Sequence, residues 1–172
     1  MKNVFVPDYT ADKVTDIDFE RLAEEGVRCV IFDADNTLLS YDETAPREEI
    51  KELCRRLRSK NICVCILSNG HSRRIRNVAD SLEMDFIGDA LKPVKKGFKR
   101  CLDKYGLRPR EAVVVGDQIF TDIWGAGRAG CVSVLVKPIK LENEPGFVKV
   151  KRVLEKPFMR NIGRNALKME ER

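Results

Sequence analysis

The chain has 172 residues, of which 43% are hydrophobic and 34% are charged, and its formal net charge at pH 7 is +5. This length predicts one domain with room for a substantial hydrophobic core. Residues 1–15 are polar and mixed and no apolar run reaches membrane length, so we expect neither a signal peptide nor a membrane-spanning helix.

The six cysteines lie mostly inside expected strands or on apolar helix faces, at positions 29, 54, 63, 65, 101 and 131. They form no Cys-x-x-Cys pair, and no histidines cluster near them as a zinc site requires. We therefore expect small buried side chains in a reducing compartment rather than disulfides. The expected location is the cytoplasm.

The first expected strand in chain order, Cys29–Phe32, runs directly into the polar segment Asp33-Ala34-Asp35-Asn36-Thr37. Two acids at a strand end, two residues apart, suit a divalent cation with oxygen ligands, such as Mg²⁺. They equally suit a carboxylate nucleophile beside a general acid/base. An EF-hand does not fit, because Leu38 and Thr44 occupy its glycine and glutamate positions. A plain turn with solvated side chains is the structural alternative.

Three later apolar segments also end in polar residues. They are 62–67, followed by Ser68 and Asn69; 85–87, followed by a loop with Lys92; and 112–116, followed by Asp117 and then Asp122. Ligands of open parallel α/β sheets bind at the carboxyl ends of the strands, so we expect the four polar segments to converge.

Helices are expected between these strands, at 47–60 and 97–105, each with one apolar face. A last strand is expected at 132–136. The run Gly125–Gly130 spells G-x-G-x-x-G, but it follows a helix and precedes this strand, the reverse of a dinucleotide-binding motif. We interpret it as the turn that ends the helix.

The four ordered motifs resemble those of the haloacid dehalogenase-like (HAD) hydrolase superfamily: Asp-x-Asp-x-Thr at 33–37, serine at 68, lysine at 92, and Gly-Asp at 116–117 with an acid at 122. The resemblance covers about residues 20–137. More narrowly, the sequence is similar to class IIIA, YqeG-type phosphatases, which are related to phosphatidylglycerophosphate phosphatases. It implies an α/β, three-layer Rossmann-like HAD fold, with helices on both faces of a five-stranded parallel sheet and no cap domain.

We expect a single HAD-like hydrolase domain over residues 1–172. Its catalytic core is placed at about 20–137, and a basic amphipathic C-terminal extension at about 138–172.

The resemblance implies that Asp33 is the nucleophile, which forms an aspartyl-phosphate, and that Asp35 protonates the leaving oxygen and later activates water. It also implies that Mg²⁺ is held by Asp33, Asp117 and the backbone carbonyl of Asp35. Asp122 would complete or orient the metal shell, and Thr37 would fix the turn after the first strand.

The resemblance further implies that Ser68, Asn69 and Lys92 bind the oxygens of the transferring phosphoryl group. Lys92 is preferred as the lysine because Ala-x-Lys-Pro matches the family pattern, but Lys95 stays open as the alternative.

The gaps between the expected strands leave no room for a cap domain, and a HAD phosphatase without a cap admits bulky substrates. The resemblance implies a Mg²⁺-dependent phosphomonoester hydrolase that converts phosphatidylglycerophosphate to phosphatidylglycerol. The alternatives are phosphoprotein, nucleotide or nucleic-acid-end substrates, and a non-catalytic phosphate-binding or scaffold protein. The expected partner is the phosphorylated substrate, with an anionic phospholipid considered and no nucleic acid expected.

The positive charge is concentrated near the C-terminus, since residues 137–172 hold 10 Lys/Arg and 5 Asp/Glu, and the rest of the chain holds 22 of each sign. Segment 147–160 interleaves apolar and basic residues. It would either lie on the anionic inner face of a membrane, as a peripheral contact, or form a helix that packs on the domain through Val150, Val153 and Leu154. We favour the packed helix, because Pro157 interrupts the pattern.

Overall fold

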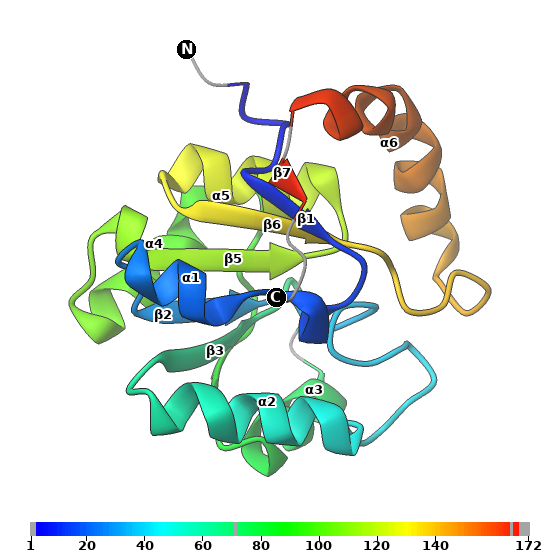
Figure 1. The fold of residues 1–172 in the computed structure, drawn as a ribbon. Coiled ribbons are helices and arrows are strands. Elements are labelled where there is room, and N and C mark those ends of the chain that lie inside the picture. The colour runs from blue at the N-terminus through cyan, green and yellow to red at the C-terminus, as the bar shows by residue number, and fades with distance from the viewer. Residues whose placement is uncertain (1–2, 71, 166, 169–172) are drawn as a thin grey trace.

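The computed structural model describes residues 3–70, 72–165 and 167–168. In these residues seven parallel strands form one sheet, in the order β4-β3-β2-β5-β6-β1-β7 (Figure 1). Their bounds are β1 Tyr9–Ala11, β2 Cys29–Phe32, β3 Cys63–Leu67, β4 Asp85–Ile87, β5 Ala112–Gly116, β6 Val132–Val136 and β7 Leu167–Lys168.

The five predicted strands are all present, and β1 and β7 extend the sheet beyond β6. Both additions are short, three and two residues long. The sequence around β1 is polar and mixed, and so short a strand is defined by its neighbour β6 rather than by its own periodicity.

The helices are α1 Phe19–Glu24, α2 Glu48–Ser59, α3 Arg73–Ser81, α4 Lys95–Tyr105, α5 Trp124–Ala129 and α6 Gly146–Asn165. Short 3₁₀ turns lie at η1 Val14–Asp16 and η2 Pro109–Glu111, and a π-helical turn lies at η3 Ile119–Ile123. The predicted helices at 47–60 and 97–105 therefore correspond to α2 and α4.

Helices cover both faces of the sheet, as predicted. Alternate residues of β2 point to opposite sides: Val30 and Phe32 pack in the core under α1, α2 and α3, whereas Cys29 and Ile31 pack in the core under α4 and α5. Because both faces of β2 are buried, all of its residues are apolar.

The six cysteines are all free thiols, and all but Cys63 are buried. This agrees with the expectation of small buried side chains without disulfides. The turn expected at the end of the helix after Asp122 is also present, since Gly130 follows α5 with a φ of +82°.

The described residues contain no cap domain. Between β2 and β3 lie only a loop and α2, and between β4 and β5 lie only a loop, α4 and η2. The carboxyl ends of the central strands β3, β2 and β5 therefore lie at one edge of the sheet with loops and no further domain beside them (Figure 1). No helix in the described part of the chain has the length and hydropathy needed to cross a membrane.

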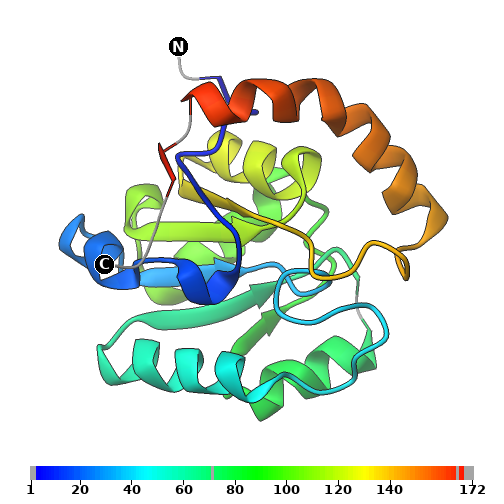
Figure 2. The same cartoon turned by 45° about the vertical axis from the view of Figure 1, so that its right-hand side comes forward.

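The C-terminal extension forms α6, which runs past η3 and curves along its length (Figure 2). Pro157 lies inside this helix and removes one of its backbone hydrogen bonds, a common cause of curvature. The predicted packing contacts are wrong: Val150, Val153 and Leu154 are exposed. The helix packs on the domain instead through other positions, Val148, Glu155 and Ile162. The last residues of the predicted extension, 169–172, lie outside the described residues.

Candidate active site

The predicted polar segments meet at the carboxyl edge of the sheet. Single carboxylate oxygens of Asp33, Asp117 and Asp122 all lie within 4.8 Å of one another. Lys92 Nζ donates to Asp33 Oδ1 at 2.5 Å and to Asp122 Oδ1 at 2.7 Å. Residues from two strand ends, one π-helical turn and one loop thus surround a single point.

Lys92 is the lysine that reaches this cluster, because its side chain is only 3% exposed and is held between two carboxylates. Burial disfavours its charged form, but Asp122 and Asp33 outweigh burial and raise the pKa of Lys92 above its usual range. Lys95 lies exposed in the first turn of α4.

Asp33 continues the ladder between β2 and β5, since its backbone N–H donates to Val115 O at 2.9 Å. Burial raises the pKa of the Asp33 carboxyl well above its usual range; Lys92 opposes this shift, and Asp122 and Asp117 add to it. Three carboxylates therefore share a site in which negative charge is poorly compensated.

Asp35, two residues after Asp33, pairs with Arg74. Arg74 also donates through Nη1 to the backbone oxygen of Glu43 at 2.6 Å, which fixes its position over the loop. Burial raises the pKa of Asp35, and Arg74 opposes the shift. A carboxyl with a raised pKa suits a proton donor better than a metal ligand.

Thr37 joins the first motif to the fourth, because its Oγ1 donates to Asp117 Oδ1 at 3.3 Å. The turn that brings it there requires a left-handed backbone at Asn36, whose φ is +62°. Asparagine tolerates this conformation better than most residues.

Ser68 and Asn69 follow β3, as predicted, and Ser68 is buried. Ser68 Oγ accepts from Gly70 N at 3.2 Å. Asn69 Oδ1 accepts from Lys92 N at 2.5 Å and its Nδ2 donates to Lys92 O at 3.0 Å, and its expected contact with phosphate stays a prediction. Its amide thereby fixes the backbone of the loop that carries the lysine.

Asp122 is turned back to the end of β5 by the π-helical turn η3. Its Oδ2 accepts from Gln118 N at 3.2 Å. Gly116 makes this possible, because a Cβ atom there would lie 2.4–2.5 Å from the Asp122 carboxyl group. Glycine is therefore required at position 116, because a larger side chain would collide with Asp122.

Arg152 of α6 is a site residue that the sequence did not identify. It pairs with the Asp117 carboxylate, donates through Nη1 to Asp117 O at 2.7 Å, and pairs with Glu144 at 2.5 Å. Buried Glu144 also accepts from Asn36 Nδ2 at 2.7 Å. No local spacing links residues so far apart, and Arg152 stands among surface lysines in the sequence.

Burial raises the pKa of Asp117 to about 7, although the neighbouring Arg152 opposes the shift. Arg74 was also not assigned by the sequence, where it is one of three arginines near the start of α3. Its distinguishing feature is its contact with Asp35, which only the folded chain provides.

The donor set fits a divalent cation. Asp33, Asp117 and Asp122 supply carboxylate oxygens, which hard cations prefer, and they converge at a point where negative charge is in excess. The expected ligand at the Asp35 backbone carbonyl stays a prediction.

Comparison with known proteins agrees with this geometry. A sequence model of the haloacid dehalogenase-like hydrolases matches residues 20–130. The chain is 33% identical over 148 residues to the probable phosphatase YqeG of Bacillus subtilis, covering 86% of this chain and 85% of that protein. It is 32% identical over 161 residues to a chloroplast and mitochondrial phosphatidylglycerophosphate phosphatase of Arabidopsis thaliana, covering 88% of this chain and 46% of that protein.

Solved structures share the fold. The cobalt-bound deoxy-D-mannose-octulosonate 8-phosphate phosphatase of Haemophilus influenzae superposes with a TM-score of 0.54 at 18% identity, covering 82% of this chain and 92% of that one. The motifs, their convergence and the sequence matches agree, and the chain therefore belongs to the haloacid dehalogenase-like hydrolases, as a phosphatase of that superfamily.

Proposed function

We propose that the protein is a Mg²⁺-dependent phosphomonoester hydrolase whose substrate is a phospholipid, phosphatidylglycerophosphate. The observation that carries the proposal is the convergence of Asp33, Asp117 and Asp122 around Lys92 at the open edge of the sheet. An aspartate nucleophile, metal-binding oxygens and a phosphate-binding cation are then within reach of one phosphoryl group.

In the first step an Asp33 carboxylate oxygen attacks phosphorus, and the bond between phosphorus and the leaving oxygen breaks. Asp35 donates its proton to that oxygen, which its raised pKa favours. In the second step Asp35 takes a proton from water as the water attacks the aspartyl-phosphate. The bond to Asp33 breaks and inorganic phosphate leaves.

Mg²⁺ would be held by Asp33 and Asp117, with Asp122 completing the shell, and would offset the repulsion between carboxylate and phosphate. Lys92 and Ser68 would bind the phosphoryl oxygens. Asn69 supports this role indirectly, through its two hydrogen bonds to the Lys92 backbone. Arg74 would hold the Asp35 side chain in place through their ion pair.

Two observations support a lipid substrate. The Arabidopsis relative is named for phosphatidylglycerophosphate, although this chain spans less than half of its length. The described residues contain no cap over the site, so a phosphate on a large or membrane-embedded molecule has access. Catalysis would then occur during peripheral contact with the inner face of a membrane.

The test is Mg²⁺-dependent phosphate release from phosphatidylglycerophosphate in mixed micelles, beside release from a soluble aryl phosphate. Asp33→Asn should abolish both reactions with the fold intact, because it removes the nucleophile. Asp103→Asn, on the exposed side of α4, is the matched control and should leave both rates unchanged.

Residual activity near wild type in Asp33→Asn would refute the mechanism. Turnover of the aryl phosphate without preference for the lipid would keep the phosphatase and refute the substrate. Phosphopeptides, nucleotides and nucleic-acid ends would then be the next substrates to compare.

A further inference from the structure

The helix α6 has an unusual distribution of polar and apolar residues. Its domain-facing side includes two charged residues: Glu155 is buried and accepts from Phe120 N at 2.8 Å, and Arg152 reaches Asp117. Surface helices normally place such residues outward and their apolar stripe inward. Both inward charges have partners: Arg152 pairs with Asp117 of the site, and Glu155 accepts a hydrogen bond from η3.

The outward side of α6 is apolar. Phe147, Val150, Val153 and Leu154 are 65%, 61%, 59% and 59% exposed. Phe147, Val150 and Leu154 follow the spacing of neighbours on one helix face, and Val153 lies beside them. Single exposed apolar residues are common, but a continuous stripe marks an interaction surface. We call these four residues the α6 stripe.

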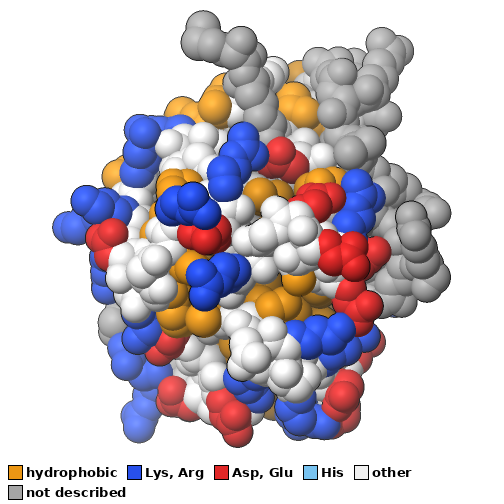
Figure 3. Space-filling model, turned by 60° about the vertical axis from the view of Figure 1, so that its left-hand side comes forward, with side chains coloured by type: hydrophobic (Ala, Val, Ile, Leu, Met, Phe, Trp, Pro, Cys, Tyr) orange, Lys and Arg blue, Asp and Glu red, His pale blue; other side chains and the backbone are white. Residues whose placement is uncertain are grey.

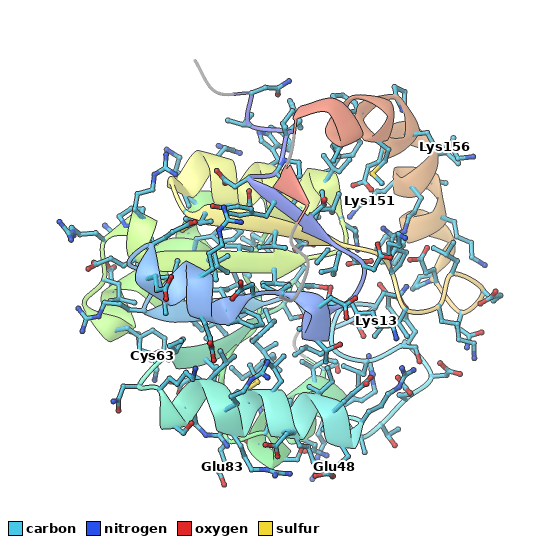
Figure 4. All side chains as sticks on the ribbon, in the orientation of Figure 1. Lys13, Glu48, Cys63, Glu83, Lys151 and Lys156 are labelled. Atoms are coloured by element: carbon cyan, nitrogen blue, oxygen red, sulfur yellow. The ribbon has the colours of Figure 1, made fainter. Side chains whose placement is uncertain are left out.

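Lysines border the α6 stripe on both sides. By the helical repeat, Lys149 and Lys156 fall on one border and Lys151 falls on the other. Figure 4 labels Lys151 and Lys156 on this helix. Within the described residues, none of the three forms an ion pair with a carboxylate: Lys149 donates to the backbone oxygen of Glu142, and Lys151 lies over the Phe147 ring.

This pattern is not general to the surface. The face shown in Figure 3 intersperses basic and acidic side chains, and α2 carries ion pairs such as Lys51–Glu48 and Arg55–Glu52. The sequence of α6, by contrast, has six basic residues and a single acid, Glu155, which is buried. Its exposed charge is therefore of one sign.

A cavity of about 580 Å³ borders this helix. Its lining includes Val153 of the stripe, exposed Met159, Arg152 and, of the proposed metal ligands, Asp117. One residue of the α6 stripe and one proposed metal ligand thus line the same largely apolar space.

We propose that the α6 stripe docks on an anionic lipid surface. The apolar side chains enter the boundary between headgroups and acyl chains, and the bordering lysines bind lipid phosphates. This inference rests on the proposed function, because docking would hold the site beside phosphates carried by lipids.

The charge pattern favours a membrane over a second copy of the chain. Two stripes packed face to face would bring the lysines of both copies together without acidic partners, and like charges across an interface oppose association. An anionic bilayer matches both features of the helix: its acyl-chain region accommodates the apolar stripe, and its anionic headgroups pair with the bordering lysines.

The test is co-sedimentation of the full chain with vesicles of phosphatidylcholine alone and of phosphatidylcholine with 30% phosphatidylglycerol, the latter at about 0.05 and 0.5 M salt. We expect binding to the anionic vesicles that weakens with salt. Val150→Asp with Leu154→Asp should reduce it at least tenfold. Lys149→Gln, Lys151→Gln and Lys156→Gln together should do the same.

The matched control replaces three exposed lysines of α4, Lys96→Gln, Lys99→Gln and Lys104→Gln, with the same change of charge. It should bind as wild type does. Every variant should hydrolyse the soluble aryl phosphate at the wild-type rate, which shows that the fold is kept. Equal loss of binding in the α4 control, or undiminished binding in both α6 variants, would overturn the docking surface.

The molecular mass in solution distinguishes dimerisation through the stripe from docking of the stripe on a membrane. A dimer in solution that Val150→Asp with Leu154→Asp dissociates would overturn the proposal, whereas a monomer supports it. The Asp33→Asn variant, which should lack hydrolysis, should bind anionic vesicles as strongly as wild type does. Failure of the proposed reaction and failure of the proposed docking can therefore be told apart.

Discussion

At the scale of single residues, the site depends on one residue that leaves room for a carboxyl group and on one that compensates the charge of another. Gly116 leaves room for the Asp122 carboxyl group, and Arg152 compensates Asp117 from a distant helix. Neither residue takes part in a bond that changes in the proposed reaction. Both set where the carboxylates lie, and both can be tested apart from the nucleophile.

Gly116→Ala should lower hydrolysis of a soluble aryl phosphate at least tenfold, because the new methyl group displaces Asp122 and the metal-binding carboxylates with it. Steady-state rates across Mg²⁺ concentrations measure the effect. Gly146→Ala is the matched control, since a Cβ there meets no atom within 4 Å, and it should keep full activity. Similar rates in both variants would contradict this role for Gly116.

Arg152→Ala should destabilise the protein by about 3 kcal/mol, because it leaves the buried carboxylates of Asp117 and Glu144 without their cation. Urea unfolding measures the change. Combining it with Glu144→Gln should cost less than the sum of the two single changes, since one of the orphaned charges is gone. Additive losses would show that the two side chains are energetically independent.

At the scale of elements, α6 is fixed to the domain by the inward charges of Arg152 and Glu155 as well as by buried Val148 and Ile162. Glu155 accepts a backbone hydrogen bond from η3, the turn that carries Asp122. The helix therefore supports the site from outside the region that the family sequence model matches, residues 20–130. Loosening α6 should affect the position of Asp122 as well as that of Asp117.

Burial raises the pKa of Glu155 above its ordinary value, and this predicts a specific dependence of stability on pH. Ionisation is harder in the folded than in the unfolded chain, so the contribution of this group to stability falls as pH rises through its folded-state pKa. Glu155→Gln keeps a hydrogen-bond acceptor without the charge. Its free energy of unfolding relative to wild type should therefore increase from about pH 4 to about pH 7.

Urea unfolding at a series of pH values measures this difference. Glu24→Gln, at an exposed position of α1, serves as the control and should follow the wild-type profile. A constant difference between Glu155→Gln and wild type across the series would contradict the predicted effect of burial.

At the scale of the whole molecule, the open edge of the sheet concentrates negative charge that the chain alone does not balance. Burial raises the pKa of both Asp33 and Asp117 in spite of Lys92 and Arg152. A bound divalent cation should therefore stabilise the entire fold, because binding to the native state alone shifts the unfolding equilibrium.

Mg²⁺ should raise the melting temperature of the chelator-treated protein, and Asp117→Asn should reduce that shift strongly because it removes a ligand. Thermal unfolding with and without Mg²⁺ measures this without reference to turnover. Asp103→Asn should keep the full shift. An equal shift in both variants would place the metal elsewhere.

Much of the fold was predictable because its strands are buried on both faces. Cys29–Phe32 and Ala112–Gly116 are continuous apolar runs with acids directly after them, and this pattern identifies both strand and site. The short strand β1 was not predicted, since three residues with mixed neighbours carry too little periodicity. The packing of α6 was predicted wrongly, because Val150, Val153 and Leu154 are exposed whereas Val148 and Ile162 of the same helix are buried.

The sequence alone determined the fold class, the family and the order of the four motifs, because hydrophobic runs and the residues that end them are local properties. Only the tertiary structure decided which charges meet. The pairing of Lys92 with Asp33 and Asp122, of Arg74 with Asp35, and of Arg152 with Asp117 joins segments far apart in the chain. Such contacts depend on strand order and helix placement, and no spacing within the sequence encodes them.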